Sequence, residues 1–220
     1  MAFHGKKQVL LLDMYGVIIK ESKGNFIPYT FGHFDETEHD RLVKAFREED
    51  FFTRAGIGEF GSDTFLSLLG YRSPDTAMRD YLENYLTLDE DFLLFAEQYH
   101  KKFDFVLLSN DVKEWSEYLF QRYGLARYFK DSIVSGAVHM RKPERRIFDY
   151  AMERVGCLPM ECIFVDNSVQ NLETAKMAGI KPVLFNRDRE VYFGDVVNDF
   201  KELGRFLDNA YGNYETEETS

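Results

Sequence analysis

The segment VLLLDMYGVI, residues 9–18, places four consecutive aliphatic residues directly before an aspartate, Asp13. A short run of this kind predicts a strand that is buried on both faces, as strands are in the centre of a parallel sheet. Asp13 stands at the point where this strand ends. The segment therefore predicts a carboxylate at the carboxyl edge of a central strand.

Other apolar runs in the chain have the same character, and helical patterns lie between them. The runs are residues 105–108, 162–165 and 182–185, with Ile133-Val134 as a weaker candidate. The helical patterns end at Gly124, Gly156 and Gly179, and glycine commonly follows the last residue of a helix. This alternation predicts an α/β fold with a doubly wound, Rossmann-like parallel sheet.

The connection between the first two predicted strands is much longer than the others. A parallel crossover needs only about a dozen residues, yet apolar residues at helical spacing, such as Leu42, Val43 and Phe46, continue far beyond that length. We predict a helical cap at residues 20–95, a core at residues 1–19 and 96–210, and a disordered acidic tail at residues 211–220. Inserted after the first strand, the cap is expected to cover the carboxyl edge of the sheet, where open α/β sheets bind ligands.

Polar residues interrupt the predicted strands at their carboxyl ends. Asp13 follows the first strand, Ser109 and Asn110 follow the second, and Asp166 follows a later one, while Lys142 opens the helix before it. Because parallel strands bring their carboxyl ends to one edge, these side chains are expected to converge there. Such a set suits phosphoryl transfer: one carboxylate attacks, the other helps to hold Mg²⁺, and the hydroxyl and ammonium bind phosphate oxygens.

Four segments resemble the motifs of a known hydrolase family. They are Leu11-Leu-Asp13-Met-Tyr-Gly16-Val-Ile, Leu107-Leu-Ser109-Asn110, Arg141-Lys142-Pro143 with Arg146-Ile-Phe148, and Ile163-Phe-Val-Asp166-Asn167-Ser with Asn171 and Ala175-Lys-Met-Ala-Gly179. Their order and spacing are similar to those of the haloacid dehalogenase (HAD)-like hydrolase superfamily, in particular the subgroup with a helical cap inserted after the first motif. Together they extend over residues 9–185.

The resemblance implies a role for each motif residue. Asp13 would be the nucleophile and form an aspartyl-phosphate, and Ser109 and Lys142 would contact the transferring group. Asp13, Asp166 and the backbone carbonyl of Tyr15 would coordinate Mg²⁺. The resemblance thus implies a magnesium-dependent phosphatase that acts on a small phosphorylated metabolite.

Further residues are candidates for substrate contact or for support of the metal ligands. The candidates for substrate binding are Asn110 and Tyr15, beside the motifs, and Arg54 and Glu59, in the predicted cap. The residues expected behind the metal ligands are Asn167 and Asn171.

The residue two positions after Asp13 departs from the pattern of most phosphatases in the family. Those enzymes have a second aspartate there, which protonates the leaving oxygen and then activates water, whereas this chain has Tyr15. A phenol, with a reference pKa of about 10, is a poor general base at neutral pH. Tyrosine at this position is similar to the true 2-haloacid dehalogenases, but those carry a small neutral residue where this chain has Asp166.

We therefore favour a phosphatase over a 2-haloacid dehalogenase, a phosphomutase or a catalytically weakened phospho-ligand binding protein. His33, in the predicted cap, is a candidate acid in place of the missing aspartate. Asp111 is interpreted as a cap for the helix that contains Trp115.

The composition of the chain limits its partners. Of 220 residues, 38 are Asp or Glu and 27 are Lys or Arg, which gives a formal net charge of −11. This balance excludes the basic surface expected for a protein that binds nucleic acid or an anionic membrane.

Cys157 and Cys162 match no zinc pattern and are expected to be core thiols. With neither a signal peptide nor a membrane span, the chain is expected to be cytoplasmic, and its sequence does not indicate an oligomeric state.

Overall fold

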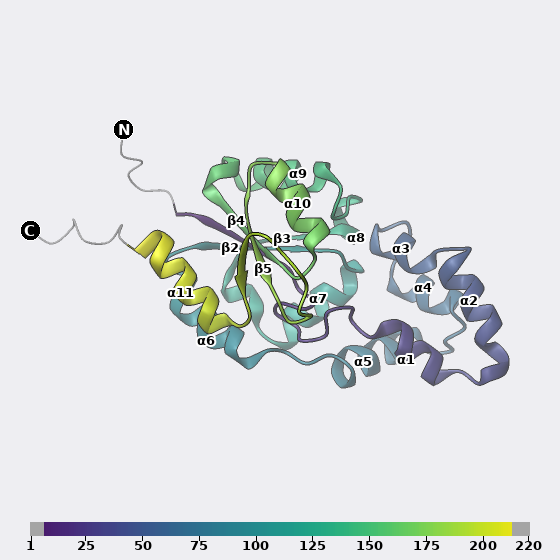
Figure 1. Ribbon diagram of the computed structural model, residues 1–220. Coiled ribbons are helices and arrows are strands. Elements are labelled where there is room, and N and C mark those ends of the chain that lie inside the picture. Colours follow the sequence, from purple (N-terminus) through teal and green to yellow (C-terminus); the bar gives the residue numbers. More distant parts are fainter. Residues whose placement is uncertain (1–6, 213–220) are drawn as a thin grey trace, which may run out of the picture.

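The computed structural model describes residues 7–212 of the chain (Figure 1). The predicted tail, residues 211–220, therefore lies outside the described residues except for its first two. Of these, Tyr211 is the last residue of helix α11 (Phe200–Tyr211). Within the described part of the chain, no helix combines the length and the apolar composition needed to cross a bilayer.

Six parallel strands form the central sheet, in the order β3-β2-β1-β4-β5-β6. Their bounds are β1 (Val9–Leu12), β2 (Asp104–Ser109), β3 (Phe129–Val134), β4 (Cys162–Asp166), β5 (Lys181–Phe185) and β6 (Asp195–Val197). Strand β1 is central, with Leu12 opposite Leu107 on one side and Val165 on the other. The doubly wound parallel sheet predicted from the sequence is confirmed.

Alternate residues of β1 face two different apolar layers. Leu10 and Leu12 belong to the layer that contains the buried residues of α11 and of α6 (Glu90–Tyr99). Val9 and Leu11 belong to the opposite layer, which contains those of α9 (Arg145–Val155) and α10 (Val169–Met177). Because helices cover both faces of the sheet, its carboxyl edge is left as the place where polar side chains can meet a ligand.

Five helices lie beyond one end of the sheet, away from the start of β1 and the end of α11 (Figure 1). They are α1 (Phe26–His33), α2 (His39–Arg47), α3 (Phe51–Gly56), α4 (Ser62–Leu68) and α5 (Pro74–Asn84). The ring of Phe26 lies at the centre of their aromatic cluster, with its centroid 5.4 Å from that of Phe65 and 5.0 Å from that of Tyr81. It also lies 4.8 Å from the ring of Trp115, in α7 (Lys113–Arg122), so the same cluster joins these helices to the core.

Helix α6 packs on the core. The ring of Phe95 lies 5.6 Å from that of Phe105 in β2 and 5.3 Å from that of Phe200 in α11. The boundary predicted between residues 95 and 96 thus falls inside a helix of the core. The sequence places this boundary too late because the helical apolar pattern runs on from the inserted segment into α6. The division of the chain into core and cap domains itself stays a prediction.

Two linkers, residues 16–20 and 87–89, lead from β1 toward helices α1–α5 and from these helices to α6, and they run beside one another. The amide of Asp89 donates a hydrogen bond to the carbonyl of Ile18 at 2.9 Å. The guanidinium of Arg187, which follows β5, pairs with Asp89 and donates to two carbonyls of the first linker at 3.1 and 3.0 Å. One side chain therefore holds both linkers together.

Candidate active site

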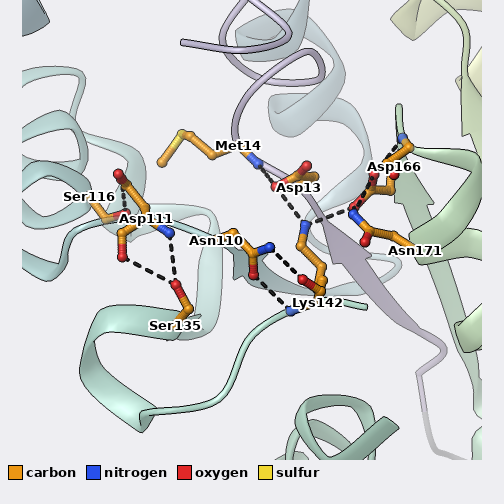
Figure 2. A network of polar contacts seen from close by, with 10 residues as sticks. Asp13, Met14, Asn110, Asp111, Ser116, Ser135, Lys142, Asp166 and Asn171 are labelled. Carbon is orange, nitrogen blue, oxygen red and sulfur yellow. Dashed lines mark hydrogen bonds and ion pairs between the residues drawn. The ribbon is translucent and has the colours of Figure 1, made fainter. Parts of the chain in front are cut away.

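The ammonium group of Lys142 lies between two carboxylates (Figure 2). Its Nζ is 2.8 Å from Oδ1 of Asp13, directly after β1, and 2.7 Å from Oδ2 of Asp166, at the end of β4. Since β1 and β4 are adjacent and parallel, their ends reach the same edge of the sheet. The structure thus brings together three predicted site residues that are far apart in the sequence.

Asn110 holds the backbone of Lys142 against the end of β2. The side-chain amide of Asn110 donates to the carbonyl of Lys142 at 2.8 Å and accepts from its backbone amide at 2.8 Å (Figure 2). Asn110 lines the cavity described below, but both polar atoms of its side chain are engaged by Lys142. Substrate binding by Asn110 therefore stays a prediction, and the structure adds a contact that positions Lys142.

The carboxylate of Asp166 is held by donors at the start of α10. The backbone amide of Ser168 donates to its Oδ1 at 2.7 Å, and the side-chain nitrogen of Asn171 lies 3.2 and 3.1 Å from its two oxygens (Figure 2). Asn171 thus lies directly behind Asp166, where the sequence placed it.

Asn167 lies beside the turn that follows Asp13. Its side-chain nitrogen donates to Asp188 at 3.2 Å, and its side chain packs against Gly16. Gly16 has a φ of 79°, and a Cβ atom at this position would lie 2.4 Å from that nitrogen. A glycine is therefore required both by the backbone conformation and by the space available.

The hydroxyl oxygen of Ser109, at the end of β2, is fully buried and has no hydrogen-bond partner within the described residues. A buried polar group without a partner costs about 1–3 kcal/mol, so such an atom commonly marks the place of a ligand. The contacts of the Asp13 carboxylate with Lys142 and the Met14 amide are both made by Oδ1, and this side chain keeps an exposed fraction of 11%.

Burial and charge shift the pKa values of these groups. Burial raises the pKa of Asp13 to about 7, against the opposing attraction of Lys142. Burial alone would lower the pKa of Lys142, but the charges of Asp13 and Asp166 outweigh it and raise the pKa. The ammonium group therefore stays charged at neutral pH, whereas burial makes Asp13 easier to protonate than an ordinary aspartate. A divalent cation beside Asp13 would favour the ionised form, which is the nucleophilic one.

A cavity of about 250 Å³ lies over these residues. The core contributes Asp13, Asn110, Asp111, Lys142 and Asn171 to its lining, and helices α3 and α5 contribute Phe52, Thr53, Gly56 and Tyr81. Residues of α3 and α5 thus lie across the cavity from the strand ends. The volume suits a small metabolite, because sites for drug-sized ligands are typically about 300–1,000 Å³.

Tyr15 and Asp111 form a second polar pair in the cavity wall. The hydroxyl of Tyr15 donates to Oδ1 of Asp111 at 3.2 Å. Burial, followed by the charge of Asp111, raises the pKa of Tyr15 well above its ordinary value. The phenol therefore keeps its proton throughout the physiological pH range and cannot act as a general base.

The interpretation of Asp111 as a helix cap was wrong. Val112 occupies the N-cap position of α7, and no side chain caps this helix. Asp111 is instead a buried residue of the cavity wall, and burial raises its pKa to about 7. A capping carboxylate and a buried carboxylate look alike in sequence, because both stand between a strand and a helix.

The variant Asp111→Asn should be more stable than the wild type at neutral and alkaline pH. Asparagine preserves the contacts: its Oδ1 can accept from the Val112 amide and the Tyr15 hydroxyl, and its nitrogen can donate to Ser116. Below about pH 3 the wild-type carboxyl is neutral in both folded and unfolded states. As pH rises to about 7, the unfolded state loses this proton first, so the wild type loses stability, by up to about 4 kcal/mol.

Thermal unfolding in the presence of a chelator, from pH 4 to pH 8, measures this effect. The advantage of Asp111→Asn should grow between about pH 4 and pH 7 and then stay level. Asp131→Asn is a matched control with the opposite sign, because hydrogen bonds from Arg154 lower the pKa of Asp131. A stability difference for Asp111→Asn that does not change with pH would contradict the prediction.

Three predicted residues of the inserted segment do not reach the cavity. Arg54 and Glu59 pair with each other at 2.7 Å on the surface, and neither lines the cavity, although their neighbour Thr53 does. His33 is an exposed residue at the end of α1, with its ring 4.7 Å from that of Tyr71. The sequence identified these residues but could not place them, because no local pattern shows which face of a short helix points toward the cavity.

The cavity also contains residues that sequence reasoning missed. They are Arg141, Lys23, Tyr81 and Trp115. Arg141 was noted only as part of the third motif, and Trp115 only as a helix marker. Their role depends on which elements the fold places opposite one another, and no local pattern indicates this.

The donor set at the strand ends is suitable for Mg²⁺. Asp13 and Asp166 both contact one ammonium group, so a single cation can serve both carboxylates. Mg²⁺ is commonly held by one or two carboxylates, with waters and substrate phosphates as the remaining ligands. No cluster of three or more His, Cys, Asp or Glu side chains suited to a metal occurs in residues 7–212, so any further protein ligand would be a neutral oxygen.

Residues 7–179 match the family model described as haloacid dehalogenase-like hydrolase. Because this match covers most of the chain, the protein belongs to the haloacid dehalogenase-like hydrolase family. The family predicted from the four motifs is thereby confirmed.

Two curated phosphatases are similar to parts of the chain. Glyceraldehyde 3-phosphate phosphatase of Methanothermobacter thermautotrophicus is 31% identical over 78 residues, which cover 35% of this chain and 34% of the relative. Phosphoserine phosphatase of Thermus thermophilus is 31% identical over 93 residues, which cover 42% and 37%. The matches thus span about a third of the length of each relative.

Several solved structures share the fold. A HAD family enzyme from Bacteroides thetaiotaomicron has a TM-score of 0.71 at 20% identity, over 82% of this chain and 94% of that one. A HAD phosphatase from Thermococcus onnurineus has a TM-score of 0.69 at 21% identity, over 91% and 97%. An L-2-haloacid dehalogenase has a TM-score of 0.68 at 17% identity, over 92% and 99%. Likeness at these identities shows the fold alone.

Proposed function

We propose that the protein is a magnesium-dependent phosphatase that hydrolyses a small phosphorylated metabolite through an aspartyl-phosphate at Asp13. The observation that carries this proposal is the meeting of Asp13 and Asp166 at one ammonium group, beneath a small cavity. The names of the two phosphatase relatives support it. So does a structure of the Bacteroides enzyme in complex with magnesium and inorganic phosphate, which has a TM-score of 0.65.

The reaction would proceed in two displacements. In the first, Oδ2 of Asp13 attacks phosphorus, the bond from phosphorus to the leaving oxygen breaks, and the leaving group departs with the bonding electron pair as an anion that takes a proton from water. In the second, water attacks the same phosphorus, and inorganic phosphate leaves with the carboxylate of Asp13 restored. Lys142 and the hydroxyl of Ser109 would bind the non-bridging oxygens. Mg²⁺, held by Asp13, Asp166 and the Tyr15 carbonyl, would neutralise phosphate charge.

Tyr15 limits which leaving groups the site can serve. Its hydroxyl already donates to Asp111, and its raised pKa keeps the proton on the phenol. A leaving group that departs without protonation suits such a site. We therefore propose that acyl or aryl phosphates are better substrates than alkyl phosphates.

Helices α1–α5 would act as the cap that excludes bulk water from this cavity. Two contacts hold them against the core: the indole nitrogen of Trp115 donates to the hydroxyl of Ser62 at 2.8 Å, and the ring of His139 lies 2.8 Å from the carbonyl of Ile57. Excluding water protects an acyl-phosphate from unproductive reactions and strengthens electrostatic interactions in the site.

Dehalogenation of a 2-haloacid is the second candidate function. The protonated Tyr15 and the L-2-haloacid dehalogenase of similar fold favour it. The buried carboxylate of Asp166 beside Asp13 disfavours it, because the charge of Lys142 is shared by two carboxylates and an anionic haloacid would approach both of them.

A panel of phosphate esters and 2-haloacids, assayed with Mg²⁺ and with a chelator, separates these functions. We expect phosphate release that depends on Mg²⁺ and no halide release. Halide release that persists in the chelator would establish the dehalogenase instead. Binding of beryllofluoride without release of either product would indicate a phospho-ligand binding protein, and isomerised sugar phosphates would indicate a mutase.

A further inference from the structure

The cavity contains cationic side chains that the proposed chemistry does not use. Arg141 and Lys23 both line it, in addition to Lys142. Lys142 is neutralised by Asp13 and Asp166. The side chains of Arg141 and Lys23, in contrast, form no ion pair or hydrogen bond with any residue in the described part of the chain. Arg141 is also partly buried, so its charge is not simply dispersed in solvent.

The absence of a carboxylate partner sets Arg141 apart from its neighbours. Arg145 pairs with Asp149 at 2.9 Å, and Arg146 pairs with Glu144. The described arginines that lack such a partner are Arg47, Arg72, Arg141 and Arg189, and of these only Arg141 lines the cavity. Because acidic residues outnumber basic ones by 38 to 27, carboxylates are plentiful, and this guanidinium is nevertheless left available.

The position of Arg141 is fixed by the same contacts that position the reacting groups. Arg141 directly precedes Lys142, whose backbone is held by two hydrogen bonds from Asn110. The backbone next to Arg141 is therefore held in place, and its side chain lines the cavity that also contains Lys142. Lys23 approaches from the first linker side of the cavity and is more exposed.

We propose that the substrate carries a second anionic group, a carboxylate or a second phosphate, and that Arg141 binds it with a smaller contribution from Lys23. This rests on the proposed phosphatase function and narrows its substrate class. A guanidinium can bind either anion through two parallel hydrogen bonds. The aromatic side chains of Phe52, Tyr81 and Trp115 in the same cavity lower the local dielectric and strengthen this interaction.

Pairs of esters that differ in one anionic group test the proposal. Phosphoglycolate and ethyl phosphate form the carboxylate pair, and propane-1,3-diol bisphosphate and propyl phosphate form the phosphate pair. For the wild type, kcat/KM should be higher for the charged member of at least one pair by about 10-fold or more. Arg141→Gln should lower kcat/KM for that member by about 10–100-fold and for its neutral partner by less than about 3-fold. The pair that responds identifies the second group as carboxylate or phosphate.

Arg146→Gln is the matched control, because Arg146 is an exposed arginine of the same segment that is paired with Glu144 and lies outside the cavity lining. It should leave all four rates unchanged. An equal loss on charged and neutral esters in Arg141→Gln would show that Arg141 binds the transferred phosphate and would overturn the proposal. So would no loss on any ester.

A binding measurement distinguishes failure of this proposal from failure of the proposed function. Calorimetric titration of Asp13→Asn, which cannot form the aspartyl-phosphate, with the same esters reports affinity without turnover. If the wild type releases no phosphate at all, the phosphatase function fails. Tighter binding of a charged ester that is lost in Asp13→Asn combined with Arg141→Gln would still support the anion site, and equal binding of both members would overturn it.

Discussion

Asp13→Asn is expected to lower the rate of Mg²⁺-dependent phosphate release by about 10⁴-fold or more. The protein should remain folded. An amide has no charge with which to attack phosphorus, so the covalent step is lost, and residual activity reflects binding and positioning alone. The fold should survive because the amide oxygen can still accept from the Met14 amide and from Lys142. Initial rates on the best substrate of the ester panel, together with a thermal unfolding curve, measure both expectations.

The wild type incubated with substrate and quenched in acid provides a positive test for the intermediate. The quenched protein should carry one phosphoryl group on the peptide that contains Asp13, and Asp13→Asn should carry none. Asp188→Asn serves as a matched control, because Asp188 is a carboxylate near the cavity that bonds Ser22 and Asn167 but does not reach Lys142. Retention of most of the activity in Asp13→Asn would end the proposed mechanism.

Lys142→Met is expected to lower both activity and stability, the latter by about 3–5 kcal/mol, because it leaves two buried carboxylates without their shared counter-charge. In a protein of this size that corresponds to a fall of roughly 10 °C in melting temperature. The loss should be greatest at and above neutral pH. It should shrink as pH falls, because protonation of Asp13, whose pKa is already raised to about 7, removes one of the two charges.

Added Mg²⁺ should restore part of the stability of Lys142→Met and restore more than it adds to the wild type. A cation that binds the two carboxylates would replace the missing ammonium and stabilise the folded state by mass action. Lys130→Met is the control, because Lys130 forms an exposed ion pair with Asp104, at 2.7 Å, and should change stability by less than about 1 kcal/mol. Equal melting temperatures for Lys142→Met and Lys130→Met would refute the electrostatic account of the site.

The parts of the fold that were predictable are those that a strong local pattern specifies. Four short apolar runs predicted four of the six strands, because a strand that is buried on both faces is apolar along its whole length. Strand β6 was not predicted. It is a three-residue edge strand that begins with the partly exposed Asp195, and such a strand leaves no distinctive pattern.

The site residues that could be predicted are likewise those with a clear local pattern in the sequence. Asp13, Asp166 and Lys142 could be identified because each stands beside a strand end or opens a helix, and parallel strands must bring such ends together. Asp111 and Arg141 were not identified as members of the site. The first differs from a helix cap only in its burial, and the second differs from Arg145 and Arg146 only in lacking a carboxylate within reach. Burial and the distance to the nearest carboxylate both depend on the folded structure, so neither can be read from the sequence.

The paired linkers described above determine how the enclosed chamber can be opened. The segments that enter and leave the five helices are hydrogen-bonded to each other, and Arg187 binds both of them. They therefore form a single hinge region, which serves as one pivot. If helices α1–α5 move to admit substrate, a rotation about this pivot would also have to break the contacts of Trp115 with Ser62 and of His139 with Ile57. The aromatic wall would therefore return to the same place over Asp13 after each passage of substrate in and product out.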